Sequence, residues 1–316
     1  MDSQSTLAGS KPRNNPGPVT TLSEYIECSR EKYDACLDCI ETDLVIDDVQ
    51  VALRFHHLRF DGNGLPKFQD LANCLADHLV EYCLSARRRN NPTQPHDFAK
   101  LHREARGLLR KVKTSGESGE ILLYFLMESV LGAPQIVAKM ELKTNRKMEV
   151  FGSDGIHAKW NEKDNCLDLY FGEAKLEKNV SSALENAFAS IEKFHADETV
   201  NLEFGLVTSH FKWSDEKVRT AVVQYVDRQK SGADCRINHA CLIGFNWDEY
   251  TKLGTLQLEA LEREFKLRYK NHASNLQKML SAQFAKCDRK RFRFEIFFLP
   301  FRTVQEFRDA FIKAVS

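Results

Sequence analysis

The sequence lacks the motifs of several common enzyme classes. It contains no G-x-x-x-x-G-K-[ST] phosphate loop, so we expect that the chain does not hydrolyse ATP and that any motor acting with it is a separate subunit. It contains neither G-x-S-x-G nor G-x-G-x-x-G, which leaves a hydrolase with a nucleophile elbow and a dinucleotide-binding enzyme both unsupported.

Long apolar runs and an excess of charge of one sign are missing as well. No stretch is apolar enough to span a membrane and no signal peptide is recognisable, so no membrane partner is expected. The 45 basic residues equal the 45 acidic residues, so the net charge alone does not indicate a nucleic-acid binder.

The cysteines do not form a recognisable framework. They number nine, an odd count, and only Cys36 and Cys39 form a C-x-x-C motif. This usage predicts a reducing, cytoplasmic location. The C-x-x-C motif has no second pair and no histidine at zinc spacing, so a structural zinc site is not favoured.

One segment of the chain carries a chemically specific pattern. Two short strands, Ile156–Trp160 and Cys166–Phe171, flank the polar turn Asn161–Asn165 and predict an antiparallel hairpin. The midpoint between Asp154 and Glu173 falls in that turn, so the hairpin places these carboxylates roughly opposite each other. Alternation along the second strand puts an apolar series and two charges on one face, namely Leu167, Leu169, Phe171, Glu173 and Lys175.

Two carboxylates and a lysine in this layout suit metal-dependent cleavage of phosphodiesters. Mg²⁺ prefers oxygen ligands and is usually held by one or two carboxylates, waters and substrate phosphate. Asp154 and Glu173 can supply the carboxylates, and the backbone at Ala174 or Lys175 can add a carbonyl. Lys175 can orient or deprotonate the attacking water and balance charge on the phosphate. The alternative is a strand-end ion cluster without a catalytic role.

The Glu-x-Lys motif by itself is weak, because the chain contains it three times. The copy at 264–266 lies in Leu256–Tyr269, where apolar residues recur at helical spacing, so it is expected on a solvated helix face. The copy at 141–143 has no aspartate in the preceding twenty residues to complete a metal site. Only the copy that begins at Glu173 has an aspartate, Asp154, across a hairpin.

A helix before the hairpin can add a third carboxylate. Ser115-Gly-Glu117-Ser-Gly-Glu120 opens an apolar run that ends at Gly132-Ala-Pro134, with serine caps at its start. Metal-dependent nucleases of this type often carry another metal-shell carboxylate in such a first turn. Glu120 is the first choice for it and Glu117 the second. The alternative is that a glutamate here only complements the helix dipole.

The order of these elements resembles the PD-(D/E)xK nuclease superfamily. The elements are a helix with Glu120, a strand at 136–142, the Asp154 hairpin, Glu173-Ala-Lys175, and a helix at 180–194. Ser153 stands where the superfamily motif has proline, a substitution that the superfamily tolerates. The resemblance implies catalytic roles for Asp154, Glu173, Lys175 and Glu120, with Asp154, Glu173 and Glu120 as metal ligands.

Longer strings resemble a narrower family. Ser-Gly-Glu-Ser-Gly-Glu-Ile-Leu-Leu-Tyr-Phe-Leu, Gly-Ser-Asp-Gly-Ile-His and Cys241-Leu-Ile-Gly-Phe-Asn-Trp247 look like the nuclease subunit of the Hachiman anti-phage defence system, the HamA type. The resemblance covers about Val49 to Ala314. It implies a deoxyribonuclease that uses Mg²⁺, or alternatively Mn²⁺. An ATP-dependent helicase subunit of the HamB type would restrain it until damaged or foreign DNA is sensed.

Basic residues cluster although the net charge is zero. The segment 87–113 holds nine Lys and Arg residues against Asp97 and Glu104. Lys139 and Arg146 border the expected site, and 286–293 is another basic stretch. Such patches contact phosphates without reading bases, although each one taken alone is also compatible with a solvated surface. The residues expected to bind DNA are Arg103, Arg106 and Arg110, at helical spacing, together with Lys143 and Lys147.

The pattern as a whole predicts an α/β fold, a PD-(D/E)xK restriction-endonuclease-like core whose mixed central sheet is flanked by helices, with an N-terminal extension. Residues 1–20 are expected to form a flexible tail, 21–113 an N-terminal region with the basic helix, and 114–316 the nuclease core with a C-terminal α/β extension. Other helices are expected at 21–39, 68–86, 98–113, 215–228, 255–285 and 304–315, and other strands at 49–60, 202–207, 239–245 and 292–299.

The sequence therefore favours a metal-dependent nuclease that cleaves DNA with little sequence preference. Two alternatives remain. One is a sequence-specific restriction-type endonuclease, for which no compact base-reading module is evident. The other is a non-catalytic regulatory DNA-binding subunit, against which the complete Asp/Glu/Lys set argues.

Overall fold

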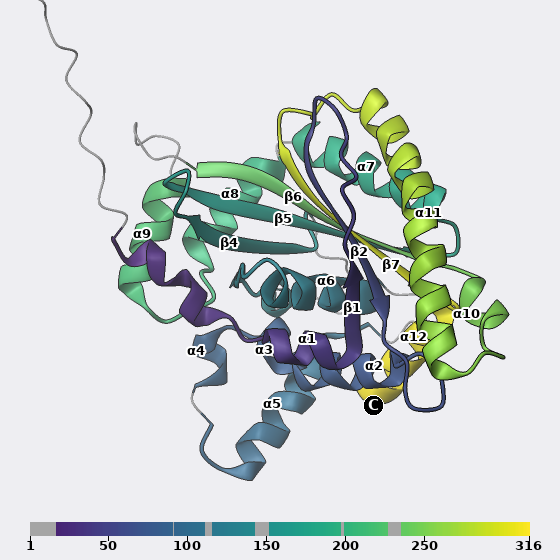
Figure 1. Ribbon diagram of the computed structural model, residues 1–316. Helices are drawn as coiled ribbons and strands as arrows, with labels where there is room; N and C mark the ends of the chain where they lie inside the picture. Colours follow the sequence, from purple (N-terminus) through teal and green to yellow (C-terminus); the bar gives the residue numbers. More distant parts are fainter. Residues whose placement is uncertain (1–16, 91, 111–115, 143–151, 197–198, 227–234) are drawn as a thin grey trace, which may run out of the picture.

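The computed structural model of the chain (Figure 1) describes residues 17–90, 92–110, 116–142, 152–196, 199–226 and 235–316. Most of the expected tail, residues 1–16, lies outside these ranges. Within them the chain forms a seven-stranded sheet in the order β1-β2-β7-β6-β5-β4-β3. The strands are β1 Leu37–Ile40, β2 Gln50–Leu58, β3 Gln135–Val137, β4 Gly155–Asn161, β5 Cys166–Glu177, β6 Cys235–Asn246 and β7 Arg293–Phe301.

The sheet is mixed, which confirms the expected α/β class. β2, β7, β6 and β5 run parallel to one another, whereas β1, β4 and β3 are antiparallel to their neighbours. The central strands β6 and β7 are covered on both faces, which explains their nearly continuous apolar runs at Ala240–Phe245 and Ile296–Phe301. β1 and β2, from the N-terminal region, belong to the same sheet as the expected site.

Helices cover both faces of the sheet (Figure 1). The α-helices are α1 Arg30–Cys36, α2 Phe68–Asp77, α3 Leu79–Cys83, α4 Ala86–Arg89, α5 Pro95–Leu108, α6 Glu117–Ser129, α7 Val180–Ala196, α8 Thr199–Ser209, α9 Glu216–Val226, α10 Glu249–Lys252, α11 Leu258–Lys286 and α12 Val304–Ala314. Two 3₁₀ helices are η1 Gly17–Tyr25 and η2 Lys139–Leu142.

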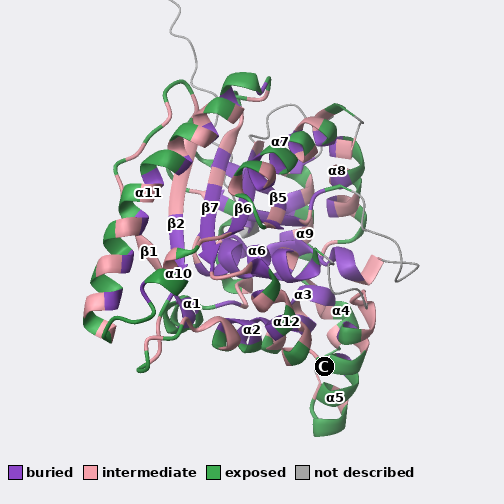
Figure 2. Cartoon of the chain, turned by 90° about the vertical axis from the view of Figure 1, so that its right-hand side faces the viewer, coloured by how far each residue is buried: buried purple, intermediate pink, exposed green. Residues whose placement is uncertain are grey.

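α6 and α7 pack on opposite faces of β5. A Cβ atom at Gly172 of β5 would lie 2.9 Å from Leu123 of α6, so the glycine allows α6 to approach closely. On the other face, the ring centroids of Phe171 and Phe194 of α7 are 4.7 Å apart. α6 runs through the interior (Figure 2), and within this helix only Glu120 is not fully buried.

Several of the predicted elements were wrong in part; the predicted helix 68–86, for example, is divided into α2 and α3. The predicted helix 21–39 is divided into η1, α1 and the strand β1, because Leu37–Ile40 pairs with β2. The predicted strand 136–142 is strand only at β3 and then turns into η2. The predicted basic helix 98–113 begins at Pro95, where Gln94 and Asp97 form a capping box, and ends at Leu108.

The predicted strand 202–207 was wrong altogether, because this segment lies in the helix α8. Leu202, Phe204 and Leu206 alternate as in a strand, and this alternation is what the sequence shows first. The residues that α8 buries are instead Val200, Glu203 and Val207, which recur at helical spacing. A buried glutamate in the middle of that series hid the helical period.

Candidate functional site

The expected hairpin is present, and its two strands end at different points. β4 and β5 pair antiparallel with Asn161 opposite Cys166 and Gly155 opposite Gly172. β4 begins at Gly155, whereas β5 continues as far as Glu177 and is there paired with β6. The edge of β5 that β4 covers is therefore no longer covered by that strand from Glu173 onwards.

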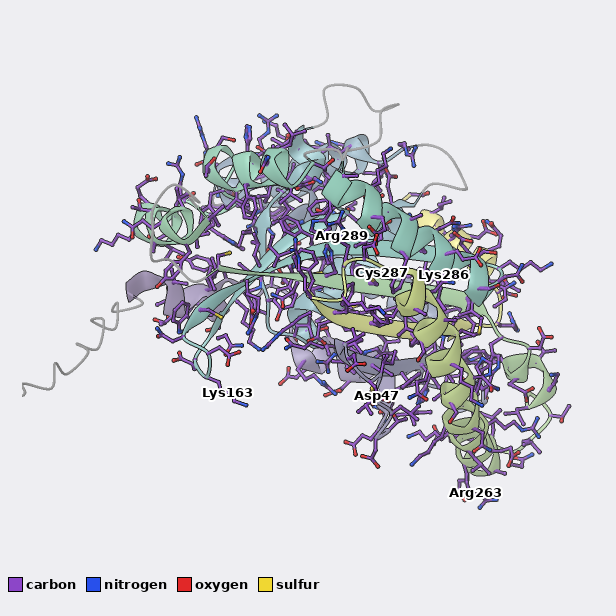
Figure 3. All side chains as sticks on the ribbon, turned by 90° about the horizontal axis from the view of Figure 1, so that it is seen from above. Asp47, Lys163, Arg263, Lys286, Cys287 and Arg289 are labelled. Atoms are coloured by element: carbon purple, nitrogen blue, oxygen red, sulfur yellow. The ribbon has the colours of Figure 1, made fainter. Side chains whose placement is uncertain are left out.

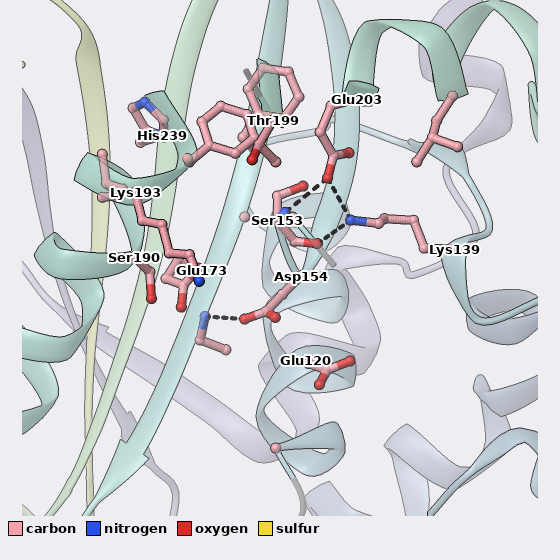
Figure 4. A pocket seen from close by; sticks show the side chains of 18 of the residues that line it. Glu120, Lys139, Ser153, Asp154, Glu173, Ser190, Lys193, Thr199, Glu203 and His239 are labelled. Carbon is pink, nitrogen blue, oxygen red and sulfur yellow. Dashed lines mark hydrogen bonds and ion pairs between the residues drawn. The ribbon is translucent and has the colours of Figure 1, made fainter. Parts of the chain in front are cut away.

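A cavity of about 830 Å³ lies at this edge. Side chains from both faces of the sheet reach it, because the neighbouring strand has ended. Its walls come from η2, the segment before β4, β5, and the helices α6, α7 and α8. Figure 4 shows Asp154 in its centre, with Glu203, Lys139 and Ser153 on one side, Glu120 on the other, and Glu173 with Ser190 and Lys193 beside them.

Asp154 is held against the edge of β5 by two hydrogen bonds. Its backbone N–H donates to the carbonyl of Gly172 at 2.8 Å, which continues the β4–β5 pairing by one residue. Its Oδ2 accepts the backbone N–H of Ala174 at 2.7 Å. The carboxylate thus satisfies a strand-edge amide and stands next to Glu173, as the hairpin predicts.

Glu173 and Lys175 form an ion pair at the cavity wall, with 2.5 Å between Lys175 Nζ and Glu173 Oε1. Burial, followed by the charge of Asp154, raises the pKa of Glu173 to about 7, against the opposing effects of Lys175 and the Ser190 hydroxyl. Burial lowers the pKa of Lys175, but the attraction of Glu173 and Asp154 outweighs it and leaves this pKa raised. Two acidic groups are therefore close enough to repel each other.

The structure distinguishes the two candidate helix glutamates. Glu120 lines the cavity and accepts a hydrogen bond from the Tyr82 hydroxyl at 3.1 Å. Glu117 is buried, and its two carboxylate oxygens accept the backbone N–H of Arg110 at 3.0 and 2.8 Å. Glu117 thus fixes the chain after α5, and Glu120 is the glutamate placed at the cavity.

The other two Glu-x-Lys motifs have local partners away from the cavity. On α11, Glu264 pairs with Arg268 at 2.7 Å, and Lys266 pairs with Asp38 at 2.7 Å. Glu141 accepts hydrogen bonds from the backbone N–H and the hydroxyl of Ser85, at 2.6 and 3.2 Å. The sequence context of the motif, and not the motif itself, identified the copy at the cavity.

The residues expected to bind DNA are dispersed. Arg103 and Arg106 are exposed on α5, and Arg106 donates a hydrogen bond to the carbonyl of Ser316. Arg110 was expected on the same helix but follows its end, and it lines the cavity with its Nε 3.9 Å from Glu117. Lys143 and Lys147 lie outside the described residues.

The basic stretch at 286–293 is partly neutralised. Figure 3 labels Lys286, Cys287 and Arg289 at the end of α11. Arg289 pairs with Glu192 of α7 at 3.2 Å, and Arg293 lies 3.4 Å from Asp164. This stretch therefore offers less free positive charge than its sequence suggests.

Sequence reasoning missed several residues that line the cavity. The sequence places Lys139 in a basic patch beside the site, yet this lysine is buried and pairs with Glu203, with 2.7 Å between Nζ and Oε1. Ser190 and Lys193, one turn of α7 apart, line the wall beside Glu173. The helical period of the 180–196 segment was visible in the sequence and could have placed this pair on the side of α7 that faces the cavity.

The donor set fits a magnesium ion bound through few protein ligands. Across the part of the chain that the structure describes, no three His, Cys, Asp or Glu side chains gather closely enough to form a ready metal cluster. Mg²⁺ does not require one, because it usually takes one or two carboxylates and completes its shell with water and phosphate. Asp154 and Glu173 could supply those two, and the charge of Asp154, which helps burial raise the pKa of Glu173, is one that a cation would offset.

Comparison with known proteins gives the family of the chain. None of the described helices is long and apolar enough to cross a bilayer. No curated protein matches the sequence. The family model HamA matches residues 34–315. This span begins before β1, contains the whole sheet and the cavity, and ends one residue after α12. The chain therefore belongs to the HamA family, and through it to the Hachiman anti-phage defence system.

Proposed function

We propose that this protein is a Mg²⁺-dependent nuclease that cleaves DNA phosphodiester bonds with little sequence preference, as the effector of Hachiman defence. The observation that carries the proposal is the arrangement of Asp154, Glu173 and Lys175 around the open edge of β5, inside a cavity of about 830 Å³. This arrangement, with an antiparallel hairpin before a long central strand, supports membership of the PD-(D/E)xK superfamily.

The roles of the residues follow from their positions. Asp154 and Glu173 would hold the ion, with Glu120, which lines the same cavity, as the third candidate ligand. A bound Mg²⁺ would supply positive charge to the phosphate and lower the pKa of an attacking water. Lys175 has a raised pKa and is therefore protonated at neutral pH, so it acts first as a cation and hydrogen-bond donor toward water or phosphate.

Positive residues beside the cavity suit a nucleic-acid backbone. Arg110 and Lys193 line it, and Arg103 and Arg106 are exposed on the neighbouring α5. Lysine and arginine bind phosphates without reading bases, which agrees with cleavage of unrelated sequences. Mn²⁺, which also prefers oxygen ligands, is expected to replace Mg²⁺.

The proposal includes a partner. The chain has no phosphate loop, so sensing that depends on ATP requires another subunit. We infer that an ATP-dependent helicase of the HamB type holds the nuclease at low activity. The region before residue 115 and the C-terminal helices are the candidate surfaces for this partner.

The direct test is incubation of the purified protein with supercoiled plasmid and Mg²⁺, with and without EDTA. Relaxation, linearisation and then a smear, all prevented by EDTA, are expected. Discrete bands from one plasmid would favour the restriction-type alternative. Cleavage that persists in EDTA, or that Glu173→Ala retains while folded, would show that this site is not the active site.

A further inference from the structure

A buried ion pair lies next to Asp154 and has no role in the proposed chemistry. Lys139 of η2 and Glu203 of α8 are 3% and 1% exposed, and their Nζ and Oε1 atoms are 2.7 Å apart. Charged residues are almost never buried so fully unless they are paired. The chain therefore places two charges in its interior, beside the cavity, at a substantial desolvation penalty.

Both charges bind the same residue of the backbone. Glu203 Oε1 accepts the N–H of Ser153 at 2.9 Å. Lys139 Nζ donates to the carbonyl of Ser153 at 2.5 Å. The pair thus holds both polar groups of the residue that directly precedes Asp154 (Figure 4).

The neighbouring residue is adapted to this contact. Gly152 has a φ of +94°, which disfavours residues with a side chain, and a Cβ atom there would collide with the Glu203 carboxylate. The close approach of the carboxylate to this backbone therefore requires glycine. Ser153 is also fixed from its own side chain, because its hydroxyl donates to the carbonyl of Gly155 at 3.2 Å.

We propose that Lys139 and Glu203 are positioning residues that fix the Gly152–Ser153 backbone so that the Asp154 carboxylate stands at the metal position beside Glu173. This inference rests on the proposed metal-dependent function. The backbone before Asp154 is not in a strand, since β4 begins at Gly155, although the Asp154 N–H still donates to the carbonyl of Gly172. The Lys139–Glu203 pair supplies the hydrogen bonds to Ser153 that a neighbouring strand would otherwise make.

The pair also connects the site to α8, a surface helix. Leu202, adjacent to Glu203, is 69% exposed and lines the cavity. A displacement of α8 would withdraw Glu203 from Ser153, and the backbone that positions Asp154 would then be less well fixed. The position of this helix is thereby linked to the affinity of the site for its ion.

The test uses a double variant, Lys139→Met with Glu203→Leu, which replaces the ion pair by apolar side chains of similar size. Such replacements often preserve or raise stability, so the fold is expected to persist. We expect the affinity for Mn²⁺, measured by electron paramagnetic resonance, to fall roughly 10- to 100-fold, as for other residues that orient metal ligands. Hydrogen exchange at the amides of residues 152–154 should accelerate.

A matched control is the pair formed by the buried Lys212 and the half-buried Glu27, with Nζ and Oε2 2.7 Å apart, which does not line the cavity. Lys212→Met with Glu27→Leu is expected to leave Mn²⁺ affinity unchanged, whatever it does to stability. Glu203→Gln keeps an oxygen for the Ser153 N–H but removes the charge that holds Lys139. The Mn²⁺ affinity of Glu203→Gln should fall by less than that of the double variant. If the double variant does not fold, an unchanged Mn²⁺ affinity of Glu203→Gln refutes the positioning role.

The outcomes separate this inference from the proposed function. If the wild-type chain binds Mn²⁺ no better than Asp154→Ala does, the metal site itself is wrong, and only the exchange rates at 152–154 then report on the pair. If the wild-type chain binds Mn²⁺ at Asp154 but the double variant keeps both its affinity and its slow exchange, the positioning role is refuted.

Discussion

At the scale of single residues, the proposed site consists of three side chains from one hairpin. Glu173→Ala, Asp154→Ala and Lys175→Ala are each expected to reduce plasmid cleavage by about 10²-fold or more, because each removes a metal ligand or the cation beside the phosphate. The rate of cleavage by the folded variants, checked by circular dichroism, is the measurement.

Glu264→Ala is the matched control for this prediction. It removes the same residue type from another Glu-x-Lys motif, whose glutamate pairs with Arg268 on α11. Its cleavage rate should equal that of the wild type. Equal losses in the two glutamate variants would mean that the hairpin position has no special role.

Glu173 also predicts a dependence of stability on pH. Its pKa is raised from 4.5 to about 7 by burial and by Asp154, so between these values the folded chain binds more protons than the unfolded chain. The stability contributed by the protonated form is therefore lost as the pH rises from 4.5 towards about 7. The change is on the order of 3 kcal/mol, from the shift in pKa.

The measurement is thermal unfolding in EDTA across that pH range, for the wild type and for Glu173→Gln. Glutamine has no proton to lose in this range, so the melting temperature of the variant should fall less steeply as the pH rises. Added Mg²⁺ should reverse the effect in the wild type above pH 7, because the ion favours the ionised carboxylate. Parallel curves for the two proteins in EDTA would contradict the raised pKa.

At the scale of elements, the sequence predicted those helices and strands whose structure depends on residues close together in the chain. The hairpin, the position of Glu173 opposite Asp154 and the helix α6 were all predicted, since a tight polar turn sets the register of two adjacent strands. β1 was missed because its pairing with β2 joins residues separated by a long loop. α8 was missed because a buried Glu203 interrupts its apolar face, and its partner Lys139 comes from a distant part of the chain.

The element α5, together with Arg110 just after its end, carries a prediction of its own. Arg103→Gln, Arg106→Gln and Arg110→Gln together should weaken DNA binding to a similar extent for unrelated sequences. The slope of log K against log salt should become shallower by about 1 for each phosphate that the variant no longer neutralises. Arg263→Gln with Lys270→Gln, two exposed positions of α11, is the control and should leave the slope unchanged. An unchanged slope in the α5 variant would make α5 an ordinary solvated surface.

At the scale of the whole molecule, the N-terminal region is joined to the core that carries the site. Glu27 pairs with Arg89 at 2.5 Å and with Lys212 at 2.7 Å. Glu128 of α6 accepts the backbone N–H of Glu27 at 2.8 Å and that of Cys28 at 3.0 Å. α6 also carries Glu120 at the cavity, so the N-terminal region is hydrogen-bonded to a helix that reaches the proposed site.

The last prediction concerns that partner. An indiscriminate deoxyribonuclease would destroy the DNA of its own cell, and this chain contains no nucleotide switch of the phosphate-loop type to restrain it. We expect co-expression with an ATP-dependent helicase of the HamB type to yield a stable complex. Cleavage by this complex should be low, and should rise when the helicase hydrolyses ATP on DNA. A complex that contains a helicase unable to hydrolyse ATP is the control and should stay inactive. If the two proteins never associate and the isolated chain cuts DNA at fixed sites, the restriction-type alternative replaces the proposal.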